Sequence, residues 1–278
     1  MGLLTTKIKS ILDYYIDSSF HVSLCTICYV LLIYNQVYFS IEITDYIFYD
    51  LLFIFGTTYF AYNFIKFYEI LVSKSKPIYI LTWVFFILAI ICLLFSVFIF
   101  FLFPLTKQII SVFIAFLTIS YTIPFYKKYT LRSNPLIKIL TISISWVFII
   151  VVLPFIEILD ICFLTYYSVV IFLMVTVQMV PFEIRDAKLD AYHTKNSVNI
   201  YGLKLVKKIG YILLFSILVF QIIFSIINDN FKIQASSLII LVIMALLIRK
   251  STSNQFKYYS SLLVESVPIY WLIIDLLL

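Results

Sequence analysis

Two carboxylates four residues apart, Asp186 and Asp190, are the residues of this chain best suited to chemistry. They lie in a polar segment directly after a long apolar run. If a helix continues through them, both side chains project from the same face. Mg²⁺ typically takes one or two carboxylates together with substrate phosphates. The spacing therefore predicts a Mg²⁺–diphosphate site, and the alternative is a solvated charge run in which both aspartates pair with Arg185 and Lys188.

Two polar side chains within apolar runs raise a related question. Gln178 lies eight residues before Asp186, on the same helical face, and could point into a pocket below the aspartates. The alternative is a hydrogen bond between helices, since polar groups in a membrane face either a cavity or another helix. Asn63, near the end of an earlier apolar run, poses the same question.

A third polar segment is basic. Lys127, Lys128 and Arg132 follow another apolar run and would form a positively charged rim. The alternative needs no ligand, because basic residues gather on one side of any membrane protein.

The composition restricts what can position these residues. Of 278 residues, 64% are hydrophobic and 12% are charged, whereas soluble domains have roughly 45–50% apolar and about 25% charged residues. This argues against a soluble enzyme, a disordered chain and a nucleic-acid-binding domain. With four glycines, a Gly-rich phosphate loop is also excluded, because such loops need backbone without a Cβ.

The apolar runs have the length of membrane helices, about 20 residues. They are apolar on every face, which excludes the alternating pattern of a transmembrane barrel. The sequence therefore predicts an all-α polytopic membrane protein with about nine transmembrane helices, at residues 20–39, 46–65, 78–99, 106–124, 138–157, 160–182, 209–228, 234–249 and 261–278.

The basic residues orient these spans. With nine spans, all of the 20 Lys and Arg residues except Lys107 and Lys232 fall on the side of the N-terminus. By the positive-inside rule that side is cytoplasmic, and the C-terminus lies outside. We expect one integral domain in the inner or plasma membrane of a bacterium, with an amphipathic interfacial helix at 1–18 followed by a nine-helix bundle at 20–278.

The polar segments together resemble those of the UbiA-type intramembrane prenyltransferases. That family has two Asp-rich motifs, after its second and sixth helices, and the second motif is similar to Arg185-Asp186-x-x-x-Asp190 followed by Lys195. The segment 121–124, which precedes two lysines, also resembles the family's fourth helix exit. The first motif departs from the family pattern.

In the first motif the family has Asn-Asp-x-x-Asp-x-x-x-Asp. Here Asn63 is retained, but Phe64, Phe67 and Leu71 occupy the three Asp positions. Lys66 could contact a phosphate directly and so replace a metal ion.

The resemblance implies a UbiA-like helical bundle with a cavity facing the cytoplasm. It implies transfer of an isoprenyl group from an isoprenyl diphosphate to an aromatic or membrane-soluble lipid acceptor, with Asp186 and Asp190 as the catalytic Mg²⁺ ligands. The substrate-binding residues would be Asn63, Lys66, Lys128, Arg132, Gln178, Arg185 and Lys195. Two alternatives stay open: a UbiA-fold protein that binds lipid without catalysis, and an unrelated polytopic carrier.

Overall fold

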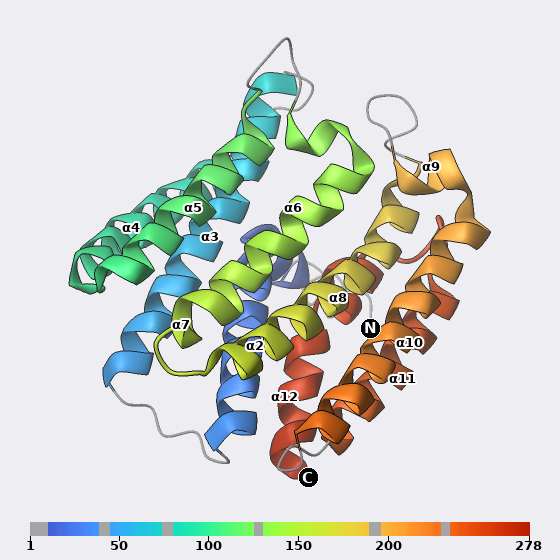
Figure 1. Cartoon of the computed structure of the whole chain (residues 1–278). Coiled ribbons are helices and arrows are strands. Elements are labelled where there is room, and N and C mark those ends of the chain that lie inside the picture. The colour runs from blue at the N-terminus through green and yellow to red at the C-terminus, as the bar shows by residue number, and fades with distance from the viewer. Residues whose placement is uncertain (1–10, 39–44, 74–79, 125–129, 189–195, 229–233) are drawn as a thin grey trace.

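The protein is a bundle of long helices, seen in a computed structural model (Figure 1). Every regular element in the part of the chain that the structure describes is a helix. That part comprises residues 11–38, 45–73, 80–124, 130–188, 196–228 and 234–278.

Within the described residues, nine rods run along the bundle, and two of them combine more than one type of helix. The fifth and last rods contain π-helical segments, η2 and η4. The helices are α2 (Phe20–Tyr38), α3 (Asp45–Ser73), α4 (Ile80–Leu102), α5 (Leu105–Thr122), α6 (Pro135–Val147) with η2 (Phe148–Val152) and α7 (Leu153–Phe155), α8 (Ile161–Asp186), α10 (Leu203–Ile227), α11 (Ala235–Lys250), and η4 (Tyr259–Val264) with α12 (Val267–Leu277). The short helices η1 (Leu131–Ser133) and α9 (Ser197–Tyr201) precede α6 and α10.

Seven of these rods are long and apolar enough to cross a membrane. Each of the nine predicted spans coincides with a rod, but α3 and α11 are not among the seven. α11 has only 16 residues, about 24 Å at 1.5 Å per residue. An all-α polytopic membrane protein is therefore confirmed, while the count of nine spans stays a prediction.

Polar caps fix where the two helices nearest the polar segments begin. Asp160 accepts hydrogen bonds from the backbone N–H groups of Cys162 and Phe163 at the start of α8. Asn134 does the same for α6, whose first residue is Pro135. Both arrangements are favourable at a helix N-terminus, where the first backbone N–H groups have no partner within the helix. The capping side chains accept from such groups, and Pro135 has no N–H that needs a partner.

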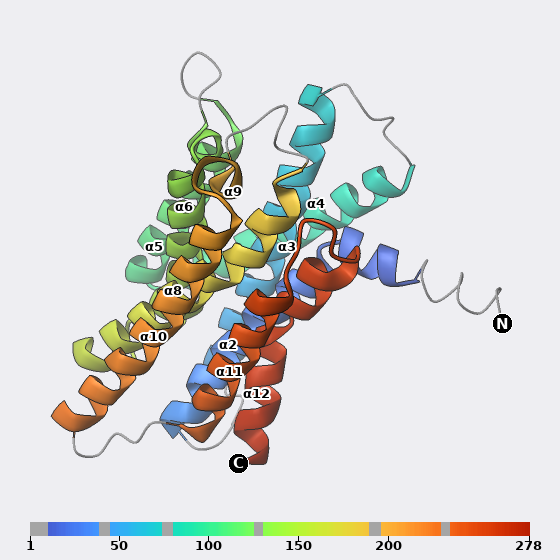
Figure 2. The same ribbon diagram turned by 90° about the vertical axis from the view of Figure 1, so that its right-hand side faces the viewer.

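The rods pack pairwise around α8. α8 lies against α6 and α10, α2 against α3 and α12, and α3 against α4 (Figures 1 and 2). The ends of α3 and α8 and the start of α6 lie at the same end of the bundle, at the top of Figure 1, whereas the C-terminus lies at the bottom. We call the former the basic end, after its lysines and arginines.

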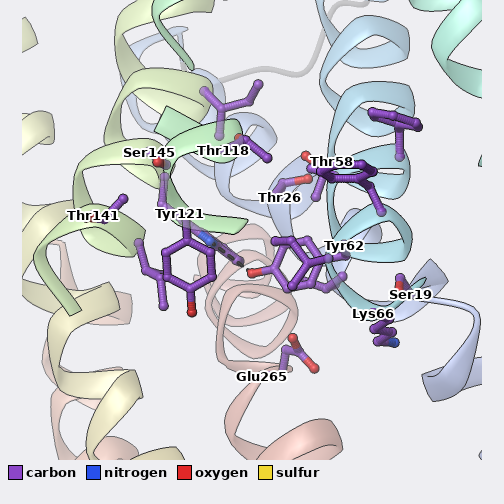
Figure 3. Close-up of a pocket in the computed structure, with 18 of the residues that line it drawn as sticks. Ser19, Thr26, Thr58, Tyr62, Lys66, Thr118, Tyr121, Thr141, Ser145 and Glu265 are labelled. Atoms are coloured by element: carbon purple, nitrogen blue, oxygen red, sulfur yellow. Dashed lines mark hydrogen bonds between the residues drawn. The ribbon is translucent and has the colours of Figure 1, made fainter. Parts of the chain in front are cut away.

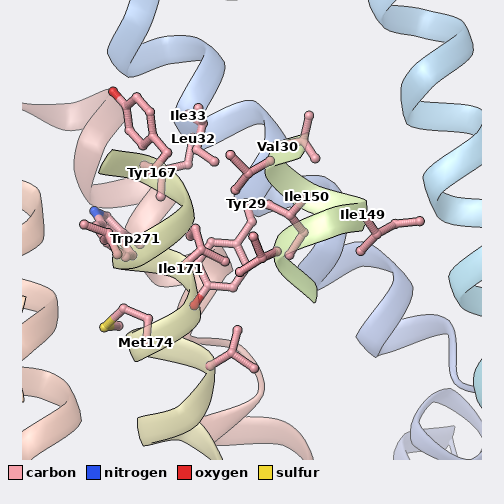
Figure 4. Close-up of a cluster of buried hydrophobic side chains, with 14 of the residues drawn as sticks. Tyr29, Val30, Leu32, Ile33, Ile149, Ile150, Tyr167, Ile171, Met174 and Trp271 are labelled. Carbon is pink, nitrogen blue, oxygen red and sulfur yellow. The ribbon is translucent and has the colours of Figure 1, made fainter. Parts of the chain in front are cut away.

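The core lies where α2, η2, α8 and α12 meet (Figure 4). Tyr29 is fully buried there, with its ring edge-on to Trp271 at 6.3 Å between centroids. On the outside, α4 exposes large apolar side chains such as Phe98 and Phe101. Such a surface is at home in lipid, where exposing apolar groups has no hydrophobic cost.

Candidate functional site

A cavity of about 980 Å³ lies between these helices. It is lined by α2, α3, α5, α6, α8 and the segment around η4, with one residue from α4. Much of its wall is apolar, including Phe53, Ile114, Ile142, Ile149 and Val175. A space of this size and character suits an apolar ligand.

The charged residues of the wall lie towards the basic end. Lys66 and Glu69 are in the last turns of α3, Arg132 precedes α6, and Arg185 and Asp186 end α8. Figure 3 shows Thr58, Tyr62 and Lys66 following one another along α3 towards this end. The polar ends of the two helices that carry the motif positions therefore share one cavity.

Asp186 forms an ion pair with its neighbour Arg185. Arg185 Nε donates to Asp186 Oδ1 at 2.7 Å and Nη2 donates to Oδ2 at 3.2 Å. The guanidinium also lies over the ring of Phe182, 5.0 Å from its centroid. Both carboxylate oxygens thus accept from one arginine. Asp190, the second predicted ligand, lies outside the described residues.

Gln178 combines both alternatives that the sequence left open. It lines the cavity, and it also joins three elements. Tyr29 Oη donates to its Oε1 at 3.2 Å, and its Nε2 donates to Val264 O at 3.4 Å. Asn63 is buried, and its Nδ2 donates to Ser18 O and to Tyr59 O. Its predicted contact with a substrate stays a prediction.

The segment before α2 is attached to the cavity wall by charged groups. Lys66 Nζ donates to the carbonyl oxygens of Ile16 (3.2 Å) and Asp17 (3.1 Å), at the end of the helical stretch 11–17. Lys257 forms an ion pair with Asp13, and this hydrogen bond raises the pKa of the Lys257 ammonium. Residues 16, 17 and 19 line the cavity, so the segment is part of its wall.

Arg132 lines the cavity, and its partner is on α3. It forms an ion pair with Glu69, and its guanidinium lies 6.0 Å from the ring centroid of Tyr121. Lys127 and Lys128, the other members of the predicted rim, and Lys195 of the second motif lie outside the described residues.

The three first-motif positions that lack aspartate have different surroundings. Phe64 lines the cavity. Phe67 stacks on Phe86 of α4 at 4.0 Å between centroids and meets Trp83 edge-on. Leu71 is exposed. The two phenylalanines thus contribute packing and cavity wall at positions where the UbiA-type first motif has aspartates.

Sequence reasoning missed Glu265, a carboxylate in the cavity wall (Figure 3). Its backbone N–H donates to Ser260 O, five residues back, at 3.1 Å. This π-helical bond ends η4, and π-bulges are frequent at functional sites. Glu265 is close enough to Lys66 and Arg185 for electrostatic attraction. Its signal was an acid well inside the apolar span 261–278, because such residues are costly in a membrane.

A buried ion pair beside the cavity was also missed. Lys138 Nζ donates to Glu183 Oε1 at 2.7 Å, with side-chain exposures of 10% and 1%. Glu183 Oε2 accepts from Ser197 N at 3.0 Å, and Asn196 Nδ2 donates to Glu183 O at 3.1 Å. The pair therefore holds α6, α8 and α9 together at the basic end.

Solved structures with the same arrangement decide the fold. One is a digeranylgeranylglyceryl phosphate synthase, with TM-score 0.62 and 13% identity over 98% of this chain and 100% of that chain. Another is a UbiA homolog from Archaeoglobus fulgidus, with TM-score 0.65 and 11% identity over 95% of this chain and 97% of that one. This chain has the UbiA-type intramembrane prenyltransferase fold.

The UbiA-type fold was predicted from the polar segments, and it is confirmed. The A. fulgidus homolog has also been solved bound to GPP and Mg²⁺, with TM-score 0.62 and 11% identity over 95% of this chain and 98% of that chain. No protein-family model and no curated protein matches the sequence. The near-complete coverage in both directions argues against an unrelated carrier.

The described residues offer limited donors for a metal ion. Among them, no group of three or more His, Cys, Asp or Glu side chains is placed to hold one. An ion that arrives with a diphosphate takes most of its ligands from the phosphates and needs only one or two carboxylates. Asp186, at the cavity wall, fits that smaller requirement.

Proposed function

We propose that this protein is an intramembrane prenyltransferase that transfers an isoprenyl group from an isoprenyl diphosphate to an aromatic or membrane-soluble acceptor. The observation that carries the proposal is the single cavity, apolar along much of its wall and charged where α3 and α8 end. An isoprenoid chain fits the apolar part, and its diphosphate fits the charged end. The UbiA-type fold supports this assignment.

The charge of the wall supports a requirement for a divalent cation. The described lining residues almost balance one another, because five cations face four carboxylates: Lys66, Arg132, Lys138, Arg185 and Lys257 against Asp17, Glu69, Asp186 and Glu265. A diphosphate ester carries about three negative charges, so a Mg²⁺ ion held by Asp186, with Asp190 as the second predicted ligand, would offset the excess. When bound, the ion stabilises the charge that grows on the leaving diphosphate.

The chain itself supplies three further contributions. Arg185 and Arg132 place fixed positive charge beside the leaving group, which stabilises negative charge developing there. Aromatic rings of the wall, including Tyr62 and Trp146, whose indole donates to Tyr62 Oη at 3.2 Å, can stabilise an allylic cation by about 0.5–2 kcal/mol each. The apolar wall excludes water, which would otherwise capture that cation.

Replacing Asp186 tests the proposal. We expect the purified protein to bind geranyl diphosphate (GPP) only with Mg²⁺, and Asp186→Asn to weaken this binding at least about tenfold, because charged hydrogen-bond and ion contacts contribute about 1.5–3 kcal/mol. Isothermal titration calorimetry with and without Mg²⁺ measures both effects.

The control is Glu157→Gln, which removes an exposed acid between α7 and α8 and should leave GPP affinity unchanged. If Asp186 serves only as the partner of Arg185, its removal frees that arginine and GPP binds as tightly or more tightly without metal. That result would remove the site assignment.

A second function has one specific observation in its favour. Phe64, Phe67 and Leu71 replace first-motif acids, and Phe67 is stacked into the α3–α4 interface. A UbiA-fold protein that binds lipid without catalysis needs no first motif. The two functions differ in a single measurement, because only the transferase releases inorganic diphosphate from GPP when acceptor lipids from a membrane extract are supplied.

We also propose that the basic end faces the cytoplasm, as the partition of Lys and Arg predicts. In that orientation a C-terminal epitope tag should be reached by antibody from outside intact spheroplasts, and an N-terminal tag only after permeabilisation. The opposite pattern, or equal labelling of both tags, would contradict the orientation.

A further inference from the structure

Ser19 has an unusual conformation and an unsatisfied side chain. Its φ is +65°, the one positive value among the described residues other than glycine. Such backbone is costly for a residue with a Cβ and gathers at functional sites. Ser19 is only 2% exposed, and its buried Oγ has no hydrogen-bond partner. A buried hydroxyl normally has such a partner. Ser19 lines the cavity, so this hydroxyl without a protein partner lies at the cavity wall.

Ser19 stands at the N-terminus of α2, a helix of 19 residues. The N–H of Phe20 donates to Ser18 Oγ, and that of Ser23 to Ser19 O, so the Ser19 side chain takes no part in capping. The first turn of a helix presents backbone donors and the positive end of the helix dipole, which together favour an anion. His21 and Val22 of this turn also line the cavity.

Lys66 adds a full positive charge to the same place. Its ammonium donates to the carbonyls of Ile16 and Asp17, which leaves one of its three N–H donors. Figure 3 shows Lys66 beside Ser19, with Glu265 across from them. Glu265 attracts Lys66 when no ligand is bound. An anionic ligand that replaced Glu265 as the counter-charge of Lys66 would be repelled by the Glu265 carboxylate.

We propose that the first turn of α2, the Ser19 hydroxyl and Lys66 form a binding site for a phosphoryl group. This inference deepens the proposed function and rests on it where the phosphoryl group is that of an isoprenyl diphosphate. The same chemistry would accept a separate phosphate, carried by the acceptor. Glu265 acts as the counter-charge of Lys66 that the ligand displaces.

The test uses inorganic phosphate as the probe, titrated into the full chain in detergent and followed by ³¹P NMR. Ser19→Gly removes the hydroxyl and relieves the positive φ, so it should raise thermal stability while weakening phosphate binding about tenfold. Ser120→Ala is the matched control, because it also removes a buried hydroxyl without a partner, outside the cavity lining. Its affinity for phosphate should not change.

Glu265→Gln provides the second arm, because it removes a negative charge and should tighten phosphate binding several-fold. Unchanged phosphate binding in Ser19→Gly, weaker binding in Glu265→Gln, or no phosphate binding by the unaltered chain would each overturn the proposal. Competition by GPP assigns the site to the donor diphosphate, and phosphate binding to GPP-saturated protein assigns it to a second ligand. If the proposed function fails instead, GPP binds no better than phosphate, yet Ser19→Gly still weakens phosphate binding.

Discussion

Lys138→Met is expected to lower the free energy of unfolding by about 3–5 kcal/mol. The substitution leaves the carboxylate of Glu183 buried, at 1% exposure, with the N–H of Ser197 still donating to it. Removing one partner of a buried ion pair has a cost of this size because the other charge stays desolvated. Unfolding by SDS in mixed micelles, followed by helical circular dichroism, measures the loss.

The double variant Lys138→Met/Glu183→Gln is the control for this prediction. Gln keeps an acceptor for Ser197 N but carries no charge, so most of the stability should return. Because the pair joins α6, α8 and α9 beside the cavity, the single variant should also lose ligand binding at temperatures where it begins to unfold. A single variant as stable as the unaltered protein would show that the pair does not hold these helices.

The fold could be predicted because its main signals are local. Apolar runs mark which residues prefer lipid, and each predicted span coincides with a rod. The runs do not mark where a helix stops. α3 continues past residue 65 to Ser73, and α10 begins at Leu203, before the predicted 209. In both cases charged residues such as Lys66 and Lys207 occupy the helix outside the apolar run, and a helix satisfies its own backbone in water as well as in lipid.

The site could be predicted only in part, because its members are brought together by packing between distant segments. The spacing in the second motif singled out Asp186, which lines the cavity. It could not show that both oxygens of this carboxylate accept from Arg185. Glu265 is remote in sequence from Lys66, and only the fold places both in the wall of one cavity.

Lys107 shows how the structure explains an exception in the sequence. It is one of two basic residues that fall on the acidic side of the predicted topology, where positive charge is unexpected. Its ammonium is fully buried and donates to both carboxylate oxygens of Asp50, at 2.8 and 2.7 Å. It is therefore the partner of an acid inside the bundle, linking α5 to α3, and does not act as a loop charge.

Removing Lys107 should consequently destabilise the protein as strongly as breaking the Lys138–Glu183 pair at the basic end. Lys107→Met leaves the Asp50 carboxylate at 1% exposure, with Glu157 near enough to repel it, so we expect a loss of about 3–5 kcal/mol in the free energy of unfolding. Lys107→Met/Asp50→Leu should recover this loss, because an apolar pair of similar volume has no desolvated charge.

The two ion pairs also serve as controls for each other. Lys107 and Asp50 do not line the cavity, whereas Lys138 does. In the folded protein, Lys107→Met should therefore leave GPP affinity unchanged, while Lys138→Met also alters the wall of the site. Lys107→Met could instead weaken GPP binding at a temperature where circular dichroism shows full folding. The Lys107–Asp50 pair would then be coupled to the cavity, and its assignment as a purely structural link between α3 and α5 would be wrong.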